Sequence, residues 1–190
     1  MTNDECKMIK EARDPKAEDL CLKCGLCCNG VIFADVRLQP GDNPERLKEL
    51  GLGLRKSEGR GPKAEDRNQK FAQPCVALEG CRCRIYDERP KYCRQFECLL
   101  LKSVKAGKTP PAAALRKIST ARDRVEKVRV LLRALGDTDE DVAISVRFRR
   151  VARRMGKGEL GPGTAGEYGE LTLAVQDLNL LLSEAFFPGA

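Results

Sequence analysis

Histidine is absent from this sequence of 190 residues, and tryptophan is absent as well. Without an imidazole, the chain can form no Ser/His/Asp or Cys/His catalytic pair, no histidine metal site and no histidine pH switch. No apolar run approaches the roughly 18–20 residues that a membrane-spanning helix needs. Residues 1–16 carry mixed charge and lack the apolar stretch of a secretory signal. We therefore expect a cytoplasmic protein without a membrane partner.

Cysteine, in contrast, is abundant, with ten residues in a chain of one-domain length. A dense, even set of cysteines in a short secreted protein would indicate a disulfide framework. In a chain without an export signal, the same set indicates metal binding first. We therefore expect the cysteines to be metal ligands rather than disulfide partners.

The surplus of basic residues is confined to the middle of the chain. Residues 51–110 contain 14 Lys and Arg against 7 Asp and Glu, whereas the segments on either side are nearly balanced. Half of the cysteines lie in this basic segment. A metal ion or iron–sulfur cluster held by four thiolates carries net negative charge, which nearby Lys and Arg would stabilise. An ordinary solvated basic face would give the same count.

The first cysteine group has the spacing Cys21-x2-Cys24-x2-Cys27, followed directly by Cys28. We expect this group to lie in a loop, since C-x2-C spacing lets a tight turn direct two sulfurs to one side. The same trio opens bacterial ferredoxin loops, in which the next cysteine binds elsewhere, so one remote cysteine would complete a four-iron cluster. Because Cys27 and Cys28 are adjacent, we expect their side chains to diverge. Either they bind different metals or one of them is not a ligand.

The second group lacks the paired C-x2-C knuckles of zinc ribbons, with the spacing Cys75-x5-Cys81-x-Cys83-x9-Cys93-x4-Cys98. The nine cysteines of residues 21–98 could fill two four-thiolate sites with one left over, or form a multi-zinc cluster with bridging sulfurs. On one continuous helix, Cys93 and Cys98 would lie about 140° apart around the axis. They could then hardly share a single metal ion unless that helix breaks between them.

Helical patterns dominate the rest of the chain. Short helices are predicted over residues 44–50 and from Pro90 to about Gly107, where Pro90 is near the first helical position. Longer helices are predicted over residues 109–136, 139–155 and 167–187. The first of these has an apolar stripe at steps of three and four, namely Leu115, Ile118, Ala121, Val125, Val128, Leu132 and Leu135.

The predicted fold is therefore mostly α, with a small, irregular, cysteine-rich half that is organised by metal and packs with C-terminal helices. We divide the chain into a polar leader (1–17), a cysteine-cluster metal-binding domain (18–106) and a C-terminal helical region (107–190). Within the metal-binding domain, the polar residues 55–73 are expected to form an exposed loop.

The cysteine pattern resembles that of the YkgJ-type CxxCxxCC family of bacterial proteins. The matching residues are Cys21-x2-Cys24-Gly25-x-Cys27-Cys28, Pro74-Cys75 and Cys83-x-Ile85-Tyr86-x2-Arg89-Pro90-x2-Cys93-Arg94-x-Phe96. The likeness covers roughly residues 18–102 and implies a zinc- or iron-chelating domain. It implies a ligand set of Cys21, Cys24, Cys27, Cys28, Cys75, Cys83, Cys93 and Cys98. Cys81 is an addition to the pattern that could bind in place of Cys83 or beside it, and Cys6 lies outside the pattern as a free or buried thiol.

The family includes larger flagellin lysine N-methylases, so the resemblance gives a weak case for an enzyme that modifies protein lysines. This chain is short for that role and has no Rossmann-type glycine-rich loop for S-adenosylmethionine. We assign no catalytic residue and no organic cofactor. Arg89 and Tyr86, which lie between ligands, are expected to brace the loop.

Three functions remain at this point. The first is an iron–sulfur protein, with a 4Fe-4S cluster or similar centre, that serves electron transfer or a protein-modification reaction. The second is a structural zinc protein that acts as an interaction module through its helices. The third is nucleic-acid binding through the basic residues 147–154. These have no accompanying base-stacking aromatic beyond Phe148 and are better explained as a solvated helix end. We expect a protein partner and no nucleic acid.

Overall fold

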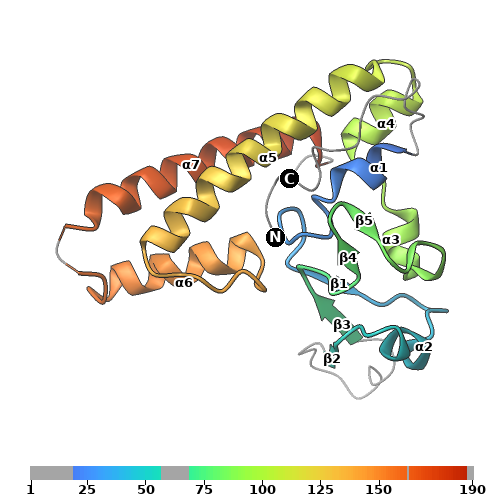
Figure 1. Cartoon of the computed structure of the whole chain (residues 1–190), viewed down its shortest axis with the longest axis horizontal. Helices are drawn as coiled ribbons and strands as arrows, with labels where there is room; N and C mark the ends of the chain where they lie inside the picture. The colour runs from blue at the N-terminus through green and yellow to red at the C-terminus, as the bar shows by residue number, and fades with distance from the viewer. Residues whose placement is uncertain (1–18, 57–68, 162, 188–190) are drawn as a thin grey trace.

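The computed structural model describes residues 19–56, 69–161 and 163–187. These ranges contain seven α-helices and two small antiparallel sheets, so the predicted mostly helical class is confirmed (Figure 1). The polar leader of residues 1–17, which includes Cys6, lies outside the described residues. Among the described residues, none of the helices has the length and apolar character required to cross a bilayer.

The last three helices form an arm that extends away from the cysteine-rich half (Figure 1). The long helix α5 (Pro111–Ala134) packs along α7 (Ala165–Ala185), and α6 (Ile144–Gly156) packs beside α5. The predicted stripe of α5 is buried from Ile118 to Leu135, whereas Leu115 is only partly buried. Each fully buried Val or Leu of this stripe stabilises the fold by about 1.5–3 kcal/mol. The arm is therefore held by ordinary apolar packing.

Helix α6 begins at Ile144, several residues later than the predicted start at 139, and the side chain of Asp137 does not cap it. The carboxylate of Asp137 instead accepts a hydrogen bond of 2.8 Å from Nε of Arg147, and both side chains are 1% exposed. Arg147 also donates to the carbonyl of Asp137 at 2.6 Å. This buried ion pair fixes the connection between α5 and α6.

The helix predicted from Pro90 to Gly107 is broken into α3 (Lys91–Gln95) and α4 (Leu99–Lys105). Phe96 is extended rather than helical, and Cys98 becomes the N-cap of α4. Leu100, Leu101 and Val104 are buried on one side of α4. Packing of α4 against the arm therefore overrides the helical continuity that the sequence favours.

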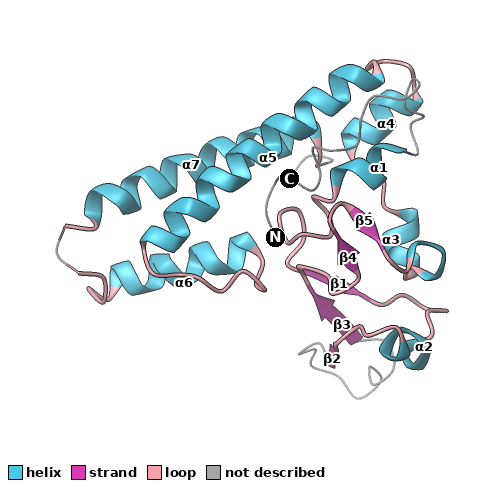
Figure 2. Cartoon of the chain, viewed as in Figure 1, coloured by secondary structure: helices cyan, strands magenta, loops and turns pink. Residues whose placement is uncertain are grey.

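The cysteine-rich half contains the short elements α1 (Asp19–Cys24), β1 (Asp35–Arg37), α2 (Pro44–Glu49), β2 (Leu54–Lys56), β3 (Gln69–Ala72), β4 (Leu78–Glu79), β5 (Arg82–Cys83) and a 3-10 turn at Tyr86–Glu88. Strand β3 lies between β1 and β2, and β4 pairs with β5 as a hairpin (Figure 2). Helix α2 matches its prediction, with Asn43 accepting a capping hydrogen bond of 3.0 Å from the Arg46 N–H. The expected loop 55–73 has strands β2 and β3 at its two ends, and its residues 57–68 lie outside the described ranges.

Two separate hydrophobic cores hold the molecule together. We call the first the helical core: it comprises the inner faces of α5, α6 and α7 together with residues of α1, α4 and the loop at Leu26 and Ile32. We call the second the sheet core: it comprises Val36, Leu38, Leu47, Leu52, Phe71, Ala77 and Ile85. The cysteine-rich half thus packs partly on the helical arm and partly on its own small core.

Gly30 marks the junction between the two halves. Its carbonyl accepts a hydrogen bond of 3.0 Å from the N–H of Ile144 at the start of α6. Its φ of +79° is a left-handed value that favours glycine, and an added Cβ would lie 2.9 Å from Cα of Ala143. Only a glycine lets the chain pass this close to α6.

Candidate metal centre

The first two cysteines lie on helix α1 and not in the predicted loop. Leu20, next to Cys21, is 3% exposed and packs in the helical core, which holds this segment helical. Cys21 and Cys24 are three residues apart and so lie on one face of the helix. Their sulfurs therefore start from a rigid element rather than from a mobile turn.

A tight turn follows α1 and presents the next two cysteines. Gly25 takes a φ of +67°, and its carbonyl accepts hydrogen bonds from the N–H groups of Cys28 (2.9 Å) and Asn29 (3.0 Å). The turn places Cys27 and Cys28 in succession, and both are partly buried.

The remaining ligand candidates reach this turn by separate routes. The N–H of Cys75 donates to the carbonyl of Cys28 at 2.7 Å, which joins the two cysteine groups directly. Cys83 is carried in by the β4–β5 hairpin, in which it pairs with Leu78. Cys93 is carried by α3, and the Sγ of Cys98 accepts a capping hydrogen bond of 3.4 Å from the Leu101 N–H.

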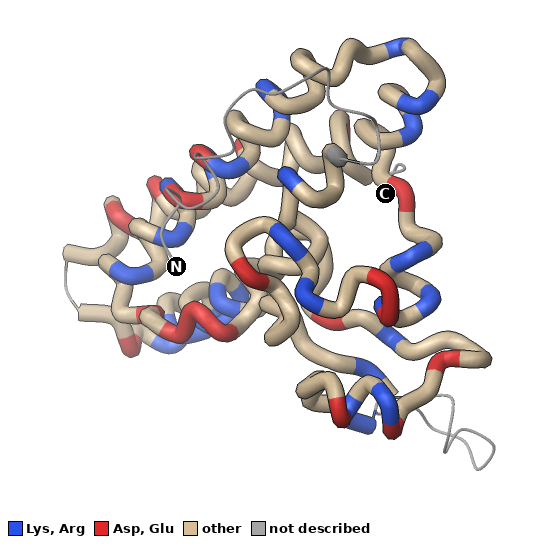
Figure 3. Tube along the Cα trace, turned by 45° about the vertical axis from the view of Figure 1, so that its right-hand side comes forward, with Lys and Arg blue, Asp and Glu red and all other residues tan. Residues whose placement is uncertain are grey.

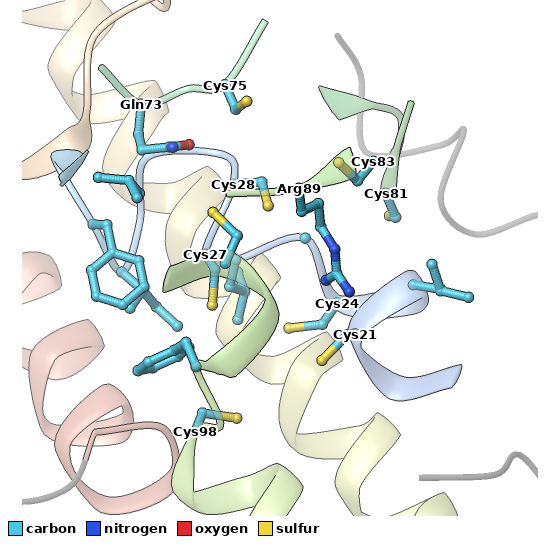
Figure 4. A pocket seen from close by; sticks show the side chains of 18 of the residues that line it. Cys21, Cys24, Cys27, Cys28, Gln73, Cys75, Cys81, Cys83, Arg89 and Cys98 are labelled. Carbon is cyan, nitrogen blue, oxygen red and sulfur yellow. The ribbon is translucent and has the colours of Figure 1, made fainter. Parts of the chain in front are cut away.

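All nine cysteines of the described residues line one cavity of about 110 Å³ (Figure 4). Eight of them are free thiols, namely Cys21, Cys24, Cys27, Cys28, Cys75, Cys83, Cys93 and Cys98. These are the eight residues that the sequence pattern implied. Among the described residues, no three Cys, Asp or Glu side chains lie close enough together to hold a single metal ion.

Burial and mutual repulsion make the thiolates costly without a cation. Burial raises the pKa of Cys24 to about 12, and neighbouring Cys98 and Cys21 contribute to that rise. Burial also raises the pKa of Cys28 and of Cys93 to about 12, and each is raised further by Cys75 and Cys83. A bound metal removes both penalties, since it replaces the protons and neutralises the crowded negative charge.

Two arginines contribute positive charge around the thiols. Arg89 donates from Nε to the Tyr86 carbonyl at 2.8 Å, and its guanidinium carbon lies 3.6 Å from the centre of the Tyr86 ring, so it braces the loop as predicted. Arg122 of α5 donates to the carbonyls of Lys23 and Cys24, the latter at 3.0 Å. Arg122 thereby binds the carboxyl end of α1, where helix carbonyls are unpaired.

Cys81 differs from the other eight because its sulfur is in a disulfide bond. That sulfur also accepts a hydrogen bond of 2.9 Å from Nη2 of Arg122. A disulfide sulfur is not a thiolate, so in this form of the protein Cys83 and not Cys81 is the available donor. The disulfide is one exception to the expectation that the cysteines are not paired.

Three features of the site lie outside what the sequence indicated. Phe33, Tyr92 and Phe96 form an aromatic cluster with ring centres 4.9–6.0 Å apart, and residues 33 and 92–96 are too distant in sequence to be linked by spacing. Gln73 also lines the cavity and is only 2% exposed. Arg122 belongs to the C-terminal helices, where its charge looks like an ordinary surface charge, and no sequence signal marked it.

An all-thiolate donor set fits zinc and iron, which are the metals that soft sulfur ligands favour. The fold and the site thus define a protein with a cysteine-only metal-chelating domain carried on a helical arm. Residues 20–111, just under half of the chain, match the family model CxxCxxCC, described as "Putative zinc- or iron-chelating domain", so this part of the chain carries such a domain. No similar curated protein and no similar solved structure was found.

Proposed function

We propose that this chain is an iron–sulfur protein of the cytoplasm that serves electron transfer to a protein partner or supports a modification reaction on one. The observation that carries the proposal is the arrangement of its first centre. Cys98, remote in sequence, lines the same cavity as the Cys21, Cys24 and Cys27 trio, and it packs against the same helical core as Cys24 and Cys27. A ferredoxin-type trio completed by one remote cysteine is a four-iron ligand set.

The geometry of the thiols also favours a cluster. In a four-iron cluster each thiolate binds a different iron, so the ligands face a common space without touching one another. The thiols here line a shared cavity in that manner. An iron–sulfur cluster supplies one-electron redox chemistry, and the surrounding residues tune its potential through hydrogen bonds, burial and charge.

The test is metal and sulfide analysis, with an absorption spectrum, on full-length protein purified without oxygen and without added metal. We expect a brown protein that bleaches on reduction, with about four irons and matching sulfide for each cluster. A colourless protein with stoichiometric zinc and no sulfide would overturn the proposal.

A structural zinc protein is the second candidate, and the size of the sheet core favours it. That core has seven buried residues, and the strands around it are two to four residues long. So small a core gives little stability alone, which is the situation in which metal binding replaces a hydrophobic core. The helical arm would then be the surface that binds a partner.

A protein partner fits the charge distribution better than nucleic acid does. Of the basic residues 147–154, Arg147 is buried against Asp137, and Arg150 pairs with Asp137 at 3.4 Å and Asp139 at 3.2 Å. Acidic and basic residues are mixed over the α6 end of the arm in Figure 3. Nucleic-acid binding needs several unpaired cations on one face to displace counterions.

A further inference from the structure

We propose that the eight free thiols form two separate four-cysteine metal centres and that the second consists of Cys28, Cys75, Cys83 and Cys93, with the buried amide of Gln73 facing it. The first centre is the set of Cys21, Cys24, Cys27 and Cys98 described under the proposed function. For the identity of the metal, this inference rests on that proposed function. The division into two sets does not depend on that identity.

Packing divides the thiols in the same way. Cys24, Cys27 and Cys98 pack against the helical core, whereas Cys75, Cys83 and Cys93 pack against the sheet core. Each core therefore fixes the positions of the three thiols that pack against it. The two cores thus define two positions for metal, one on the arm side and one on the sheet side.

Cys28 belongs to the sheet side by its backbone and its place in the cavity. Its carbonyl accepts the 2.7 Å hydrogen bond from Cys75, which ties it to the start of the second group. In Figure 4, Cys75 and Cys98 lie at opposite ends of the cavity, with Cys28 on the Cys75 side.

The division falls between two consecutive residues. Cys27 belongs to one set and Cys28 to the other, and side chains of adjacent residues diverge, so a single ion could not easily take both. Two-cluster ferredoxins use the same device, in that the cysteine after the C-x2-C-x2-C trio binds the other cluster. Here that cysteine follows without a spacer.

The aromatic cluster joins the two sides of the site. Phe33 packs on the helical core and Tyr92 on the sheet core, and their ring centres are 5.6 Å apart. Arg89 lines the cavity that both sets share.

Gln73 gives independent evidence that something binds on the sheet side. Its side-chain Oε1 is buried and has no hydrogen-bond partner among the described residues. In Figure 4 the amide points toward the space between Cys28 and Cys75. A buried amide without a partner is costly, and a half-turn about its last bond would present an N–H to a thiolate or sulfide.

The experiment uses two matched variants of the full-length protein, each loaded with iron and sulfide under anaerobic conditions. Cys21→Ser/Cys98→Ser removes the first set, and Cys75→Ser/Cys93→Ser removes the second. We expect each variant to keep about half of the iron and sulfide of the unaltered protein. After reduction, the unaltered protein should show a paramagnetic resonance spectrum broadened by two neighbouring clusters, and each variant a sharper one. Cys81→Ser, two residues from Cys83, should keep all the iron.

Loss of all metal from both variants, with helical content by circular dichroism retained, would show one shared cluster and overturn the proposal. Full iron in the Cys75→Ser/Cys93→Ser variant would overturn it too. If the unaltered protein holds two zinc ions and each variant one, the two centres stand and the iron–sulfur function fails. The two proposals therefore fail separately.

Gln73→Leu tests the second centre through a residue that is not a metal ligand, in the same two backgrounds. In the Cys21→Ser/Cys98→Ser background we expect unchanged iron and a lower reduction potential, because an N–H donor to sulfur stabilises the more negative reduced state. In the Cys75→Ser/Cys93→Ser background the same substitution should leave the potential unchanged. An equal shift in both backgrounds, or none in either, would remove Gln73 from the second centre.

Discussion

At the scale of single residues, Gly30 allows the cysteine-rich half to approach the helical arm closely. An alanine Cβ there would lie 2.9 Å from Cα of Ala143 and 3.2 Å from Cδ of Pro74, and both contacts are with groups that cannot rotate away. Gly41 also has a left-handed φ, of +96°, but an added Cβ would meet nothing within 4 Å.

We expect Gly30→Ala to be less stable to unfolding than Gly41→Ala by about 1–3 kcal/mol, the usual cost of overpacking. Both variants share the backbone cost of a left-handed alanine, so the comparison isolates the clash. Urea unfolding of the metal-loaded proteins measures the difference. Equal midpoints for the two variants would show that the junction at Gly30 can relax.

Arg122 is the second residue whose role is decided by its contacts. Its guanidinium binds the carbonyls of Lys23 and Cys24 and so holds the end of α1, which carries two ligands of the first centre. Arg122→Gln should weaken metal binding about 10-fold or more, as loss of outer-shell support does elsewhere.

The measurement for Arg122 is the rate at which a chelator removes metal from each protein. Arg116→Gln, on the exposed side of the same helix, is the matched control and should behave as the unaltered chain does. Similar rates for both variants would mean that α1 keeps its position without Arg122.

At the scale of elements, the α5–α6 connection depends on the buried pair of Asp137 and Arg147. Removing one partner of such a pair leaves an unpaired buried charge, so Arg147→Met should cost about 3–5 kcal/mol of unfolding free energy. Arg149→Met, exposed on the same helix, should change it by less than about 0.5 kcal/mol.

A double-mutant cycle completes the test of this pair. Arg147→Met/Asp137→Leu should recover much of the stability lost by Arg147→Met, because it leaves no buried charge. Thermal unfolding of the four proteins gives the coupling energy. Additive losses would mean that Arg150, 3.4 Å from the other Asp137 oxygen, already satisfies the carboxylate.

Helices that bury a long apolar stripe were predicted well from sequence, and so was the short helix α2 with its Asn43 cap, whereas α1 and the break between α3 and α4 were not. The stripe of α5 covers six turns, so its period is clear without knowledge of its neighbours. The segment at 90–107 has apolar residues that suit one helix, yet it breaks at Phe96 to Cys98. The rings of Phe96 and Phe33 lie 4.9 Å apart. The apolar period within one segment cannot indicate such a contact with a distant segment.

At the scale of the whole molecule, the two halves should respond differently to loss of metal. The helical arm has an extensive apolar core, while the cysteine-rich half has a small core and crowded buried thiols. Chelation should therefore leave α5 to α7 protected from amide hydrogen exchange and remove protection from β1 to β5 and α3. Equal loss of protection in both halves would show that metal supports the arm as well.

The sequence alone determined the chemistry of this protein. With no histidine and ten cysteines, the sequence predicts sulfur ligands, and the spacing from Cys21 to Cys27 predicts three of them. Only the tertiary structure indicated how the cysteines divide between the two proposed sets. Cys98 and Cys93 are five residues apart, but α4 packs on the helical core and Tyr92 of α3 on the sheet core, so the two thiols face different sets. The physical reason is that packing against separate cores, and not distance along the chain, determines which sulfurs meet.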